Sequence, residues 1–287
     1  MEITVLGSKG QLGQSLMDVS FNYPQHNFLF TDIDTVDIRF QRQIENFVLR
    51  NHPSVLINCA AFTAVEKAQN DFKSAMDLNI HAVENLAKVA VEHDIFLVHV
   101  STDYVHDGKQ SRLYRETDNA HPLSVYGRTK WKGEIGMKRI HCKGAIVRTS
   151  WLYSEYGSNF LRAMLNLADE NNEIKVVYDQ LGSPTYARDL AEGIMEIINQ
   201  KEKIEECETF NYTNEGVASW YDFAVEIMRL GKRKCKVLPI PSSQYPTSVK
   251  RPFHTILDKQ KFKDTFEVEI PYWRDALERC IKNTSSN

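Results

Sequence analysis

The chain has 287 residues, of which 42% are hydrophobic and 25% are charged, and its formal net charge is −3. These values are typical of a globular protein with one large domain, or with one domain and a smaller appendage. The slightly negative charge argues against a nucleic-acid partner. No apolar run approaches the roughly 20 residues that span a bilayer, so we expect no membrane partner.

The chain opens with a predicted strand at residues 2–6, which leads directly into three glycines and then a helical pattern. The glycines are Gly7, Gly10 and Gly13. In dinucleotide-binding domains, such a turn lets the backbone approach a pyrophosphate, whose charge faces the helix N-terminus. The spacing therefore predicts a phosphate-binding loop, with a tight turn that binds no ligand as the alternative.

A second strand is predicted at residues 27–30, and Asp32 follows it about 20 residues beyond the glycine loop. An acidic side chain there accepts a hydrogen bond from the adenosine ribose and opposes a 2′-phosphate, which favours NADH. Lys9 would offset that repulsion, so both NADH and NADPH are predicted cofactors. A plain turn residue is the alternative for Asp32. Asp37 and Ile38 follow in a loop suited to the adenine edge.

A third buried strand is predicted at residues 54–58, and small side chains follow it at Ala60 and Ala61. Small residues at a strand end would let a cofactor lie against the backbone. A long helical pattern covers residues 64–93. Within it, Asn79 is expected either to reach the site or, more simply, to satisfy backbone groups.

The next predicted strand, at residues 95–100, is followed by hydroxyl residues that include Thr102. Ligands of open parallel sheets bind outside the carboxyl ends of the strands. We therefore expect the glycine loop, Ala60 and Thr102 to converge on one crevice. The charged stretch at residues 105–122 is predicted to be mainly a solvated loop.

Tyr126 and Lys130 are four residues apart in a predicted helix at residues 126–134, so their side chains point to the same side. A nearby ammonium favours the phenolate, and we therefore expect the pKa of Tyr126 to lie below its usual value of about 10. Such a phenol can exchange a proton with a carbonyl oxygen near neutral pH, and Thr102 can hold the same oxygen. The Tyr-x-x-x-Lys pattern alone is common by chance.

Strands and helices alternate up to a strand at residues 144–148, which indicates an α/β fold with a Rossmann-type, doubly wound parallel sheet. Beyond it the alternation changes. The further predicted elements are helices at 159–170, 188–199, 220–230 and 271–282 and strands at 174–177 and 208–212. Residues 237–252 are proline-rich, lack a helical period and are predicted to form a substrate-contacting loop.

Two domains are predicted from this change of pattern. Residues 1–150 would form the NAD(P)-binding Rossmann domain, to which a later segment at about 174–200 partly returns. Residues 151–287 would mainly form a smaller, interleaved C-terminal α+β domain that binds the substrate.

The five cysteines are widely scattered and form no Cys-x-x-Cys pair, and the first residues show no signal-peptide pattern. We therefore expect reduced thiols, no structural zinc and a cytoplasmic location.

Several motifs together point to one family. They are Gly7-x-x-Gly10-Gln-Leu-Gly13, Asn58-Cys-Ala-Ala-Phe-Thr63, Ser101-Thr-Asp-Tyr-Val105, Tyr126-Gly-x-Thr-Lys130, Arg148-Thr-Ser-Trp151 and Asp179-Gln-x-Gly-x-Pro-Thr185. With these motifs the chain resembles the dTDP-4-dehydrorhamnose reductases, a family of extended short-chain dehydrogenases/reductases. The resemblance is strong over the first two thirds of the chain and thinner beyond.

The resemblance implies an NADH- or NADPH-dependent reduction of the 4-keto group of dTDP-6-deoxy-L-lyxo-4-hexulose to dTDP-L-rhamnose. It implies that Tyr126 is the general acid, that Lys130 tunes Tyr126 and binds the nicotinamide ribose, and that Thr102 holds the sugar oxygen. The implied cofactor-binding residues are Gly7, Gly10, Gln11, Leu12, Gly13, Asp32, Asp37, Ile38, Ala60, Ala61, Thr63, Tyr126 and Lys130. The implied substrate-binding residues are Thr102, Asp103, Tyr104, Trp151, Asn159 and Arg251.

Three of these substrate contacts have structural alternatives. Trp151 could belong to the core, and Asn159 could only cap the helix that follows it. Arg251 could pair with the diphosphate, since an arginine fork suits phosphate oxygens, or it could form a surface ion pair.

The sequence departs from the family at two positions. His106 stands where an aromatic or apolar residue is usual, which puts the packing of that loop in doubt. Ser15 lies in the region where some members carry a glutamate that binds magnesium at a dimer interface. We therefore predict no metal of that kind, and a homodimer is one possible assembly.

Two other functions stay open from the sequence. One is a reductase of a different nucleotide-linked 4-ketohexose, because the pocket formed after residue 150 decides the sugar. The other is a non-catalytic regulatory subunit on the same fold. The presence of Thr102, Tyr126 and Lys130 together argues against the second, since a binding module has no need of a tuned phenol.

Overall fold

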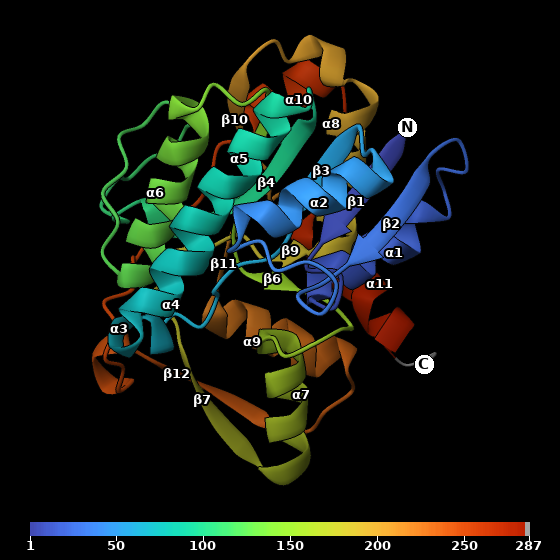
Figure 1. Cartoon of the computed structure of the whole chain (residues 1–287). Coiled ribbons are helices and arrows are strands. Elements are labelled where there is room, and N and C mark those ends of the chain that lie inside the picture. The colour runs from blue at the N-terminus through green and yellow to red at the C-terminus, as the bar shows by residue number, and fades with distance from the viewer. Residues whose placement is uncertain (285–287) are drawn as a thin grey trace.

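The architecture is an open parallel sheet with helices on both faces (Figure 1). A computed structural model describes residues 1–284. Six parallel strands pair in the order β2–β1–β3–β4–β5–β10. Their bounds are β1 Glu2–Leu6, β2 Asn27–Thr31, β3 Val55–Asn58, β4 Phe96–Thr102, β5 Gly144–Thr149 and β10 Cys207–Asn211. The order changes direction between β1 and β3, which is where such sheets bind ligands.

The helices divide between the two faces of the sheet. On one face, α1 and α8 pack against each other, and on the other α2, α5 and α6 lie side by side in front of the sheet in Figure 1. Their bounds are α1 Gln11–Ser20, α2 Gln41–Asn51, α5 Ala82–Glu92, α6 Val125–Arg139 and α8 Ala187–Asn199. Central strands covered on both faces have no polar side, and accordingly β3 and β5 are buried at every residue.

Alternate residues of the strands belong to two separate apolar clusters, one on each face of the sheet. Val5 and Ile57 pack with residues of α1 and α8, whereas Leu6 and Leu56 pack with residues of α2 and α5. Successive side chains of a strand point to opposite faces, so one apolar run serves both layers.

The later part of the chain adds a second group of elements. α7 (Phe160–Glu170), α9 (Trp220–Leu230) and α11 (Trp273–Thr284) share a third apolar cluster with β7 (Glu173–Val177). The remaining elements are β6 Leu152–Tyr153, which pairs with β9 Thr185–Tyr186; β8 Leu181–Gly182, which pairs with β11 Ala218–Ser219; β12 Lys236–Ile240; and α10 Gln260–Phe266. The strand β10 and the helix α8 return to the main sheet. The α/β, Rossmann-type prediction is confirmed; the division into two domains at residue 150 stays a prediction.

Three stretches differ from the sequence-based expectation. The helical pattern at 64–93 is broken into α3 (Lys67–Asn70), α4 (Phe72–Met76), a π-helical turn at Asp77–His81, and α5. The break has a local cause, since the Asp71 carboxylate accepts the N–H of Ser74 and starts a new helix there.

The expectation of a loop throughout 237–252 is wrong for its first residues. They belong to β12, which pairs in parallel with β7 from Lys236 opposite Glu173 to Ile240 opposite Val177. Pro239 is compatible with this strand, because each strand of a two-stranded sheet has a free edge.

The stretch 105–122 is also less solvated than expected. The Tyr114 side chain is 1% exposed, and its backbone bridges to Leu257 near the other end of the chain. Within residues 1–284, no helix has the length and apolarity that crossing a membrane requires.

Candidate active site

A pocket of about 820 Å³ lies at the carboxyl ends of β1, β3 and β4. With the exception of Asn159, every residue predicted to bind the cofactor or the substrate lines its wall. The crevice expected from the strand order is therefore present, and its wall includes both the glycine loop and Arg251.

In the glycine loop, other backbone segments lie so close to Gly7 and Gly13 that neither position has room for a side chain. Gly7 has a φ of +79°, and a Cβ on it would lie 2.7 Å from the backbone nitrogen of Ala60. A Cβ on Gly13 would lie 2.5 Å from the Gly7 carbonyl oxygen. Gly10 is different, because its Cβ would meet only that oxygen, at 3.3 Å. The space beside Gly10, at the start of α1 where no side chain caps the helix, is open to the pocket.

Charged groups surround the end of β2 beside this loop. The two Asp32 oxygens accept the backbone N–H groups of Lys9, at 3.0 Å, and Ile33, at 2.8 Å. The exposed Lys9 ammonium lies 2.9 Å from the Asp34 carboxylate. The Asp32 carboxylate and the Lys9–Asp34 ion pair thus lie at the same edge of the pocket.

Asp37 and Ile38 line the same end of the pocket. Arg39 donates from Nε to both Asp37 oxygens and from Nη2 to Oδ2, and this pairing holds the pKa of the Asp37 carboxyl below its usual value. The Ile38 side chain is also buried.

Tyr126 stands in the first turn of α6, which Ser124 caps by accepting the N–H of Gly127 at 3.0 Å. Its ring meets that of Tyr104 edge to face, with centroids 5.6 Å apart. Burial raises the pKa of Tyr126, and the Thr102 hydroxyl lowers it by less. The prediction of a lowered pKa is therefore wrong, because desolvation raises the pKa by more than the Thr102 hydrogen bond lowers it. The phenol stays protonated at neutral pH, which is the state that a proton donor needs.

Thr102 and Asp103 form a buried pair beside this phenol. The Thr102 hydroxyl donates to the Asp103 carboxylate at 3.2 Å and accepts the N–H of Tyr104. Thr255 donates to the other Asp103 oxygen at 2.5 Å. Burial raises the pKa of Asp103 to about 6 despite these donors. The pair ties the end of β4 to a segment more than a hundred residues later.

Lys130 is 2% exposed, although its side chain reaches the pocket wall. Its Nζ donates to the Val100 carbonyl oxygen at 2.6 Å and lies 3.3 Å from Nε2 of His99. Burial lowers the pKa of Lys130 to about 8, although the Glu134 carboxylate opposes this shift.

Trp151 follows β5 with a φ of +47°, which is unusual for a bulky residue. Its ring stacks on Trp220, with centroids 3.5 Å apart and planes inclined by 8°. A Cβ on Gly182 would lie 2.6 Å from the Trp151 ring, so that position has no room for a side chain. Both tryptophans line the pocket, which favours the site over the core alternative for Trp151.

Asn159 and Arg251 are placed differently from each other. The Asn159 side chain accepts the N–H of Arg162 as the cap of α7 and donates to the carbonyl oxygens of Ser154 and Tyr156, which favours its capping alternative. Arg251 lines the pocket and forms an ion pair with Glu66 at 3.4 Å.

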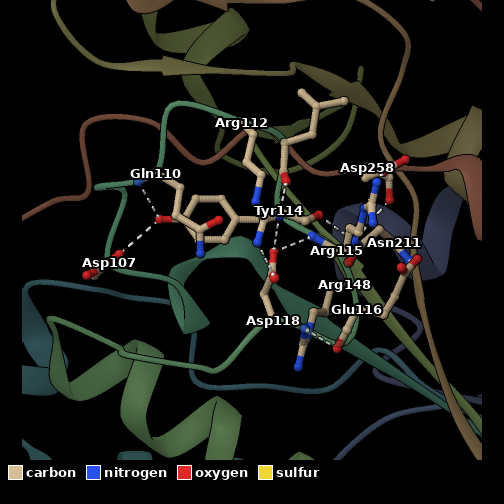
Figure 2. Close-up of polar contacts among 11 residues, drawn as sticks. Asp107, Gln110, Arg112, Tyr114, Arg115, Glu116, Asp118, Arg148, Asn211 and Asp258 are labelled. Carbon is tan, nitrogen blue, oxygen red and sulfur yellow. Dashed lines mark hydrogen bonds and ion pairs between the residues drawn. The ribbon is translucent and has the colours of Figure 1, made fainter.

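A polar network joins the stretch 105–122 to later parts of the chain (Figure 2). The Arg148 guanidinium pairs with Glu134 of α6 at 2.7 Å and reaches the Glu116 carbonyl oxygen at 3.5 Å. The Glu116 carboxylate accepts the backbone N–H of Asn211. The Asn211 amide in turn donates to the carbonyl oxygen of Tyr114. The stretch 105–122 is thus bound to β5 and β10.

Comparison with known proteins gives the family. A model of the RmlD substrate binding domain matches residues 1–286. The chain belongs to this family. A relative named dTDP-4-dehydrorhamnose reductase, from Aggregatibacter actinomycetemcomitans, is 37% identical over 286 residues, which cover 96% of each chain. The resemblance predicted from the motifs is confirmed.

Two further RmlD-family comparisons bear on the cofactor and on the sugar. The crystal structure of dTDP-4-dehydrorhamnose reductase from Bacillus anthracis, in complex with NADP, has a TM-score of 0.94 at 33% identity and covers 98% of this chain and 99% of its own. A relative from Streptomyces niveus named dTDP-4-keto-6-deoxy-D-glucose reductase is 34% identical and covers 96% of this chain and 95% of its own.

Some residues of this RmlD-family pocket were not predicted from the sequence. Phe160 and Trp220 line it and contact each other at a centroid distance of 4.6 Å. His99 and Asn58 lie behind Lys130. Asn79, by contrast, bonds to the backbone of Phe62, as its simpler alternative stated.

Proposed function

We propose that this chain is an NADPH- or NADH-dependent reductase that converts the 4-keto group of dTDP-6-deoxy-L-lyxo-4-hexulose to the hydroxyl of dTDP-L-rhamnose. The observation that carries the proposal is the meeting of Thr102, Tyr126 and Lys130 in a pocket whose other end is a glycine loop. The RmlD-family relatives that bear the name of this activity match the chain over nearly its whole length.

The residues of the pocket suit a nicotinamide dinucleotide. We assign the pyrophosphate to the open space beside Gly10, and the adenosine ribose to Asp32. When bound, the reduced nicotinamide supplies the hydride that reduces the keto carbon. The NADP complex of the Bacillus anthracis relative supports NADPH as one cofactor.

The protein's own part in the reaction is proton supply and charge stabilisation. Tyr126 donates its phenolic proton to the oxygen that becomes the hydroxyl, and the raised pKa keeps that proton in place until it is needed. Thr102 holds the same oxygen. As an ammonium, Lys130 stabilises the phenolate that remains.

The test is turnover by the full chain. With dTDP-6-deoxy-L-lyxo-4-hexulose and NADPH or NADH, we expect the absorbance of the reduced nicotinamide to fall and dTDP-L-rhamnose to appear by NMR. Absence of turnover with both cofactors would overturn the proposal and would favour a regulatory subunit on the same fold.

A second candidate is reduction of a different dTDP-4-keto sugar, which the name of the Streptomyces niveus relative suggests. We assign the choice between sugars to the aromatic part of the pocket wall, which is formed by Trp151, Phe160 and Trp220. A panel of nucleotide-linked 4-ketohexoses separates the candidates, because the natural sugar should give the highest kcat/KM.

The Gly10→Ala variant is expected to weaken NADPH binding while leaving thermal stability nearly unchanged. A methyl group there meets only one backbone oxygen but intrudes on the space assigned to the pyrophosphate, at a cost of about 1–3 kcal/mol of binding free energy. Calorimetric titration measures the affinity. Thermal unfolding of the variant without cofactor is the control, because it separates a lost binding site from a destabilised fold. Equal affinity of Gly10→Ala and the parent chain would contradict the assignment.

The Asp32→Asn variant is expected to shift preference towards NADPH by about tenfold, because it removes a charge that repels a 2′-phosphate. Paired titrations with NADPH and NADH measure the ratio. An unchanged ratio would place the adenosine ribose elsewhere.

The proposed partner of the chain is a dTDP-sugar. A homodimer and a cytoplasmic location are further proposals, and the second accords with the five free cysteines.

A further inference from the structure

Lys130 is joined to the end of β3 by a buried line of side chains. Its Nζ lies 3.3 Å from Nε2 of His99, and Nδ1 of His99 lies 3.1 Å from the amide nitrogen of Asn58. Oδ1 of Asn58 accepts the backbone N–H of Ala60 at 3.1 Å. His99 and Asn58 are both buried, so no solvent competes for these contacts.

The hydrogen bonds of this line have one consistent direction. The backbone N–H of Ala60 can only donate, so it fixes the Asn58 oxygen towards itself and the Asn58 NH₂ group towards His99. Nδ1 of His99 must then accept. Burial, the largest cause, lowers the pKa of His99 well below its usual value, so the ring is neutral. A neutral ring whose Nδ1 accepts carries its proton on Nε2, the atom that faces Lys130.

This direction has a consequence for the charge of Lys130. An ammonium has three donors and no acceptor, so it cannot accept from Nε2–H, whereas a neutral amine can. The other contact, with the Val100 carbonyl oxygen, takes a donor from either form. The His99 contact therefore favours the amine.

The other ionisable groups around Lys130 come from three elements. Glu134, one turn later on α6, raises the pKa of Lys130, and so does Cys59 after β3. Arg148 of β5 pairs with Glu134 and offsets its charge. Tyr126, on the same helix, is a neutral phenol. None of these groups provides the acceptor that the ammonium lacks at His99.

We propose that His99 is a positioning residue that acts through Lys130. Asn58 holds His99 as the Nε2–H tautomer. In this form His99 fixes Nζ of Lys130 and favours the neutral amine over the ammonium. This role rests on the proposed reduction, in which the ammonium stabilises the Tyr126 phenolate. Activity should therefore fall as the pH rises through the pKa of Lys130, since the ammonium is then lost.

The tautomer is measured without substrate or cofactor. Two-dimensional ¹⁵N–¹H NMR of the full chain, with His99 assigned by its loss in His99→Gln, should show a protonated Nε2 and an unprotonated Nδ1. The reverse tautomer, or a doubly protonated ring at neutral pH, would overturn the proposal. Because no turnover is involved, this result is separate from success or failure of the proposed function.

The pH profile of kcat/KM tests the coupling to Lys130. In His99→Gln, the amide oxygen can turn to accept from the ammonium, so the basic limb should move up by about one pH unit. His106→Gln, the same change at a buried histidine outside the line, should leave the limb in place. A His99→Gln enzyme that is slower at every pH, with an unmoved limb, would show a merely structural residue.

A second variant covers the case in which His99→Gln does not fold. Asn58→Asp keeps the shape of the side chain but accepts from Nδ1–H, so it should reverse the tautomer and move the basic limb in the same upward direction. An unchanged tautomer in Asn58→Asp would also overturn the proposal.

Discussion

The Tyr126→Phe variant is expected to lose turnover by about 100- to 10,000-fold, because it removes the hydroxyl that acts as the proposed general acid. The phenylalanine ring keeps the edge-to-face contact with Tyr104, so fold and NADPH affinity should be nearly unchanged. Steady-state kinetics with the 4-keto sugar and titration with NADPH measure the two effects separately. Comparable turnover by the variant would mean that another group supplies the proton.

Tyr104→Phe is the matched control for this experiment. It makes the same chemical change on the neighbouring ring, which also lines the pocket. If Tyr104 contacts only the substrate, its loss should raise KM more than it lowers kcat. A large fall in kcat for both variants would assign the proton donor to neither residue alone.

The Arg148→Met variant is expected to lower the free energy of unfolding by about 3–5 kcal/mol, because it leaves the Glu134 carboxylate buried without its partner. The two side chains are 4% and 2% exposed, and their closest atoms are 2.7 Å apart. Urea unfolding measures the change.

The double variant Arg148→Met with Glu134→Gln separates the charge from the packing. It removes both charges, and the Ser101 hydroxyl that donates to Glu134 can still bond to the glutamine. It should therefore be more stable than Arg148→Met alone. A double variant that is less stable than the single one would show that the cost comes from lost packing around Arg148.

The part of the site that lies in short stretches could be predicted from the sequence. The glycine loop, Thr102 and the Tyr126–Lys130 helix each combine a local pattern with the end of a strand, and strand order brings them to one edge. The alternation of strands and helices likewise predicted the parallel sheet, because each crossover repeats the same pattern.

What depends on distant contacts could not be predicted. The stacking of Trp151 on Trp220 joins positions that share no pattern, and nothing adjacent to Asn58 signals its contact with His99. The pKa of Tyr126 was expected to fall because helix spacing reveals a charge at four residues but not the loss of solvent.

The main sheet cannot be completed during synthesis until its last strand, β10, has been made. Until residues 207–211 leave the ribosome, β5 has no neighbour on its outer side, and its backbone groups can pair with another chain. The helix α8, which covers one face of the sheet, also appears only after β5. A nascent chain that stops between these points carries five of the six strands and an unpaired sheet edge that can aggregate, so translation speed and chaperone access across this interval should affect the yield of native protein.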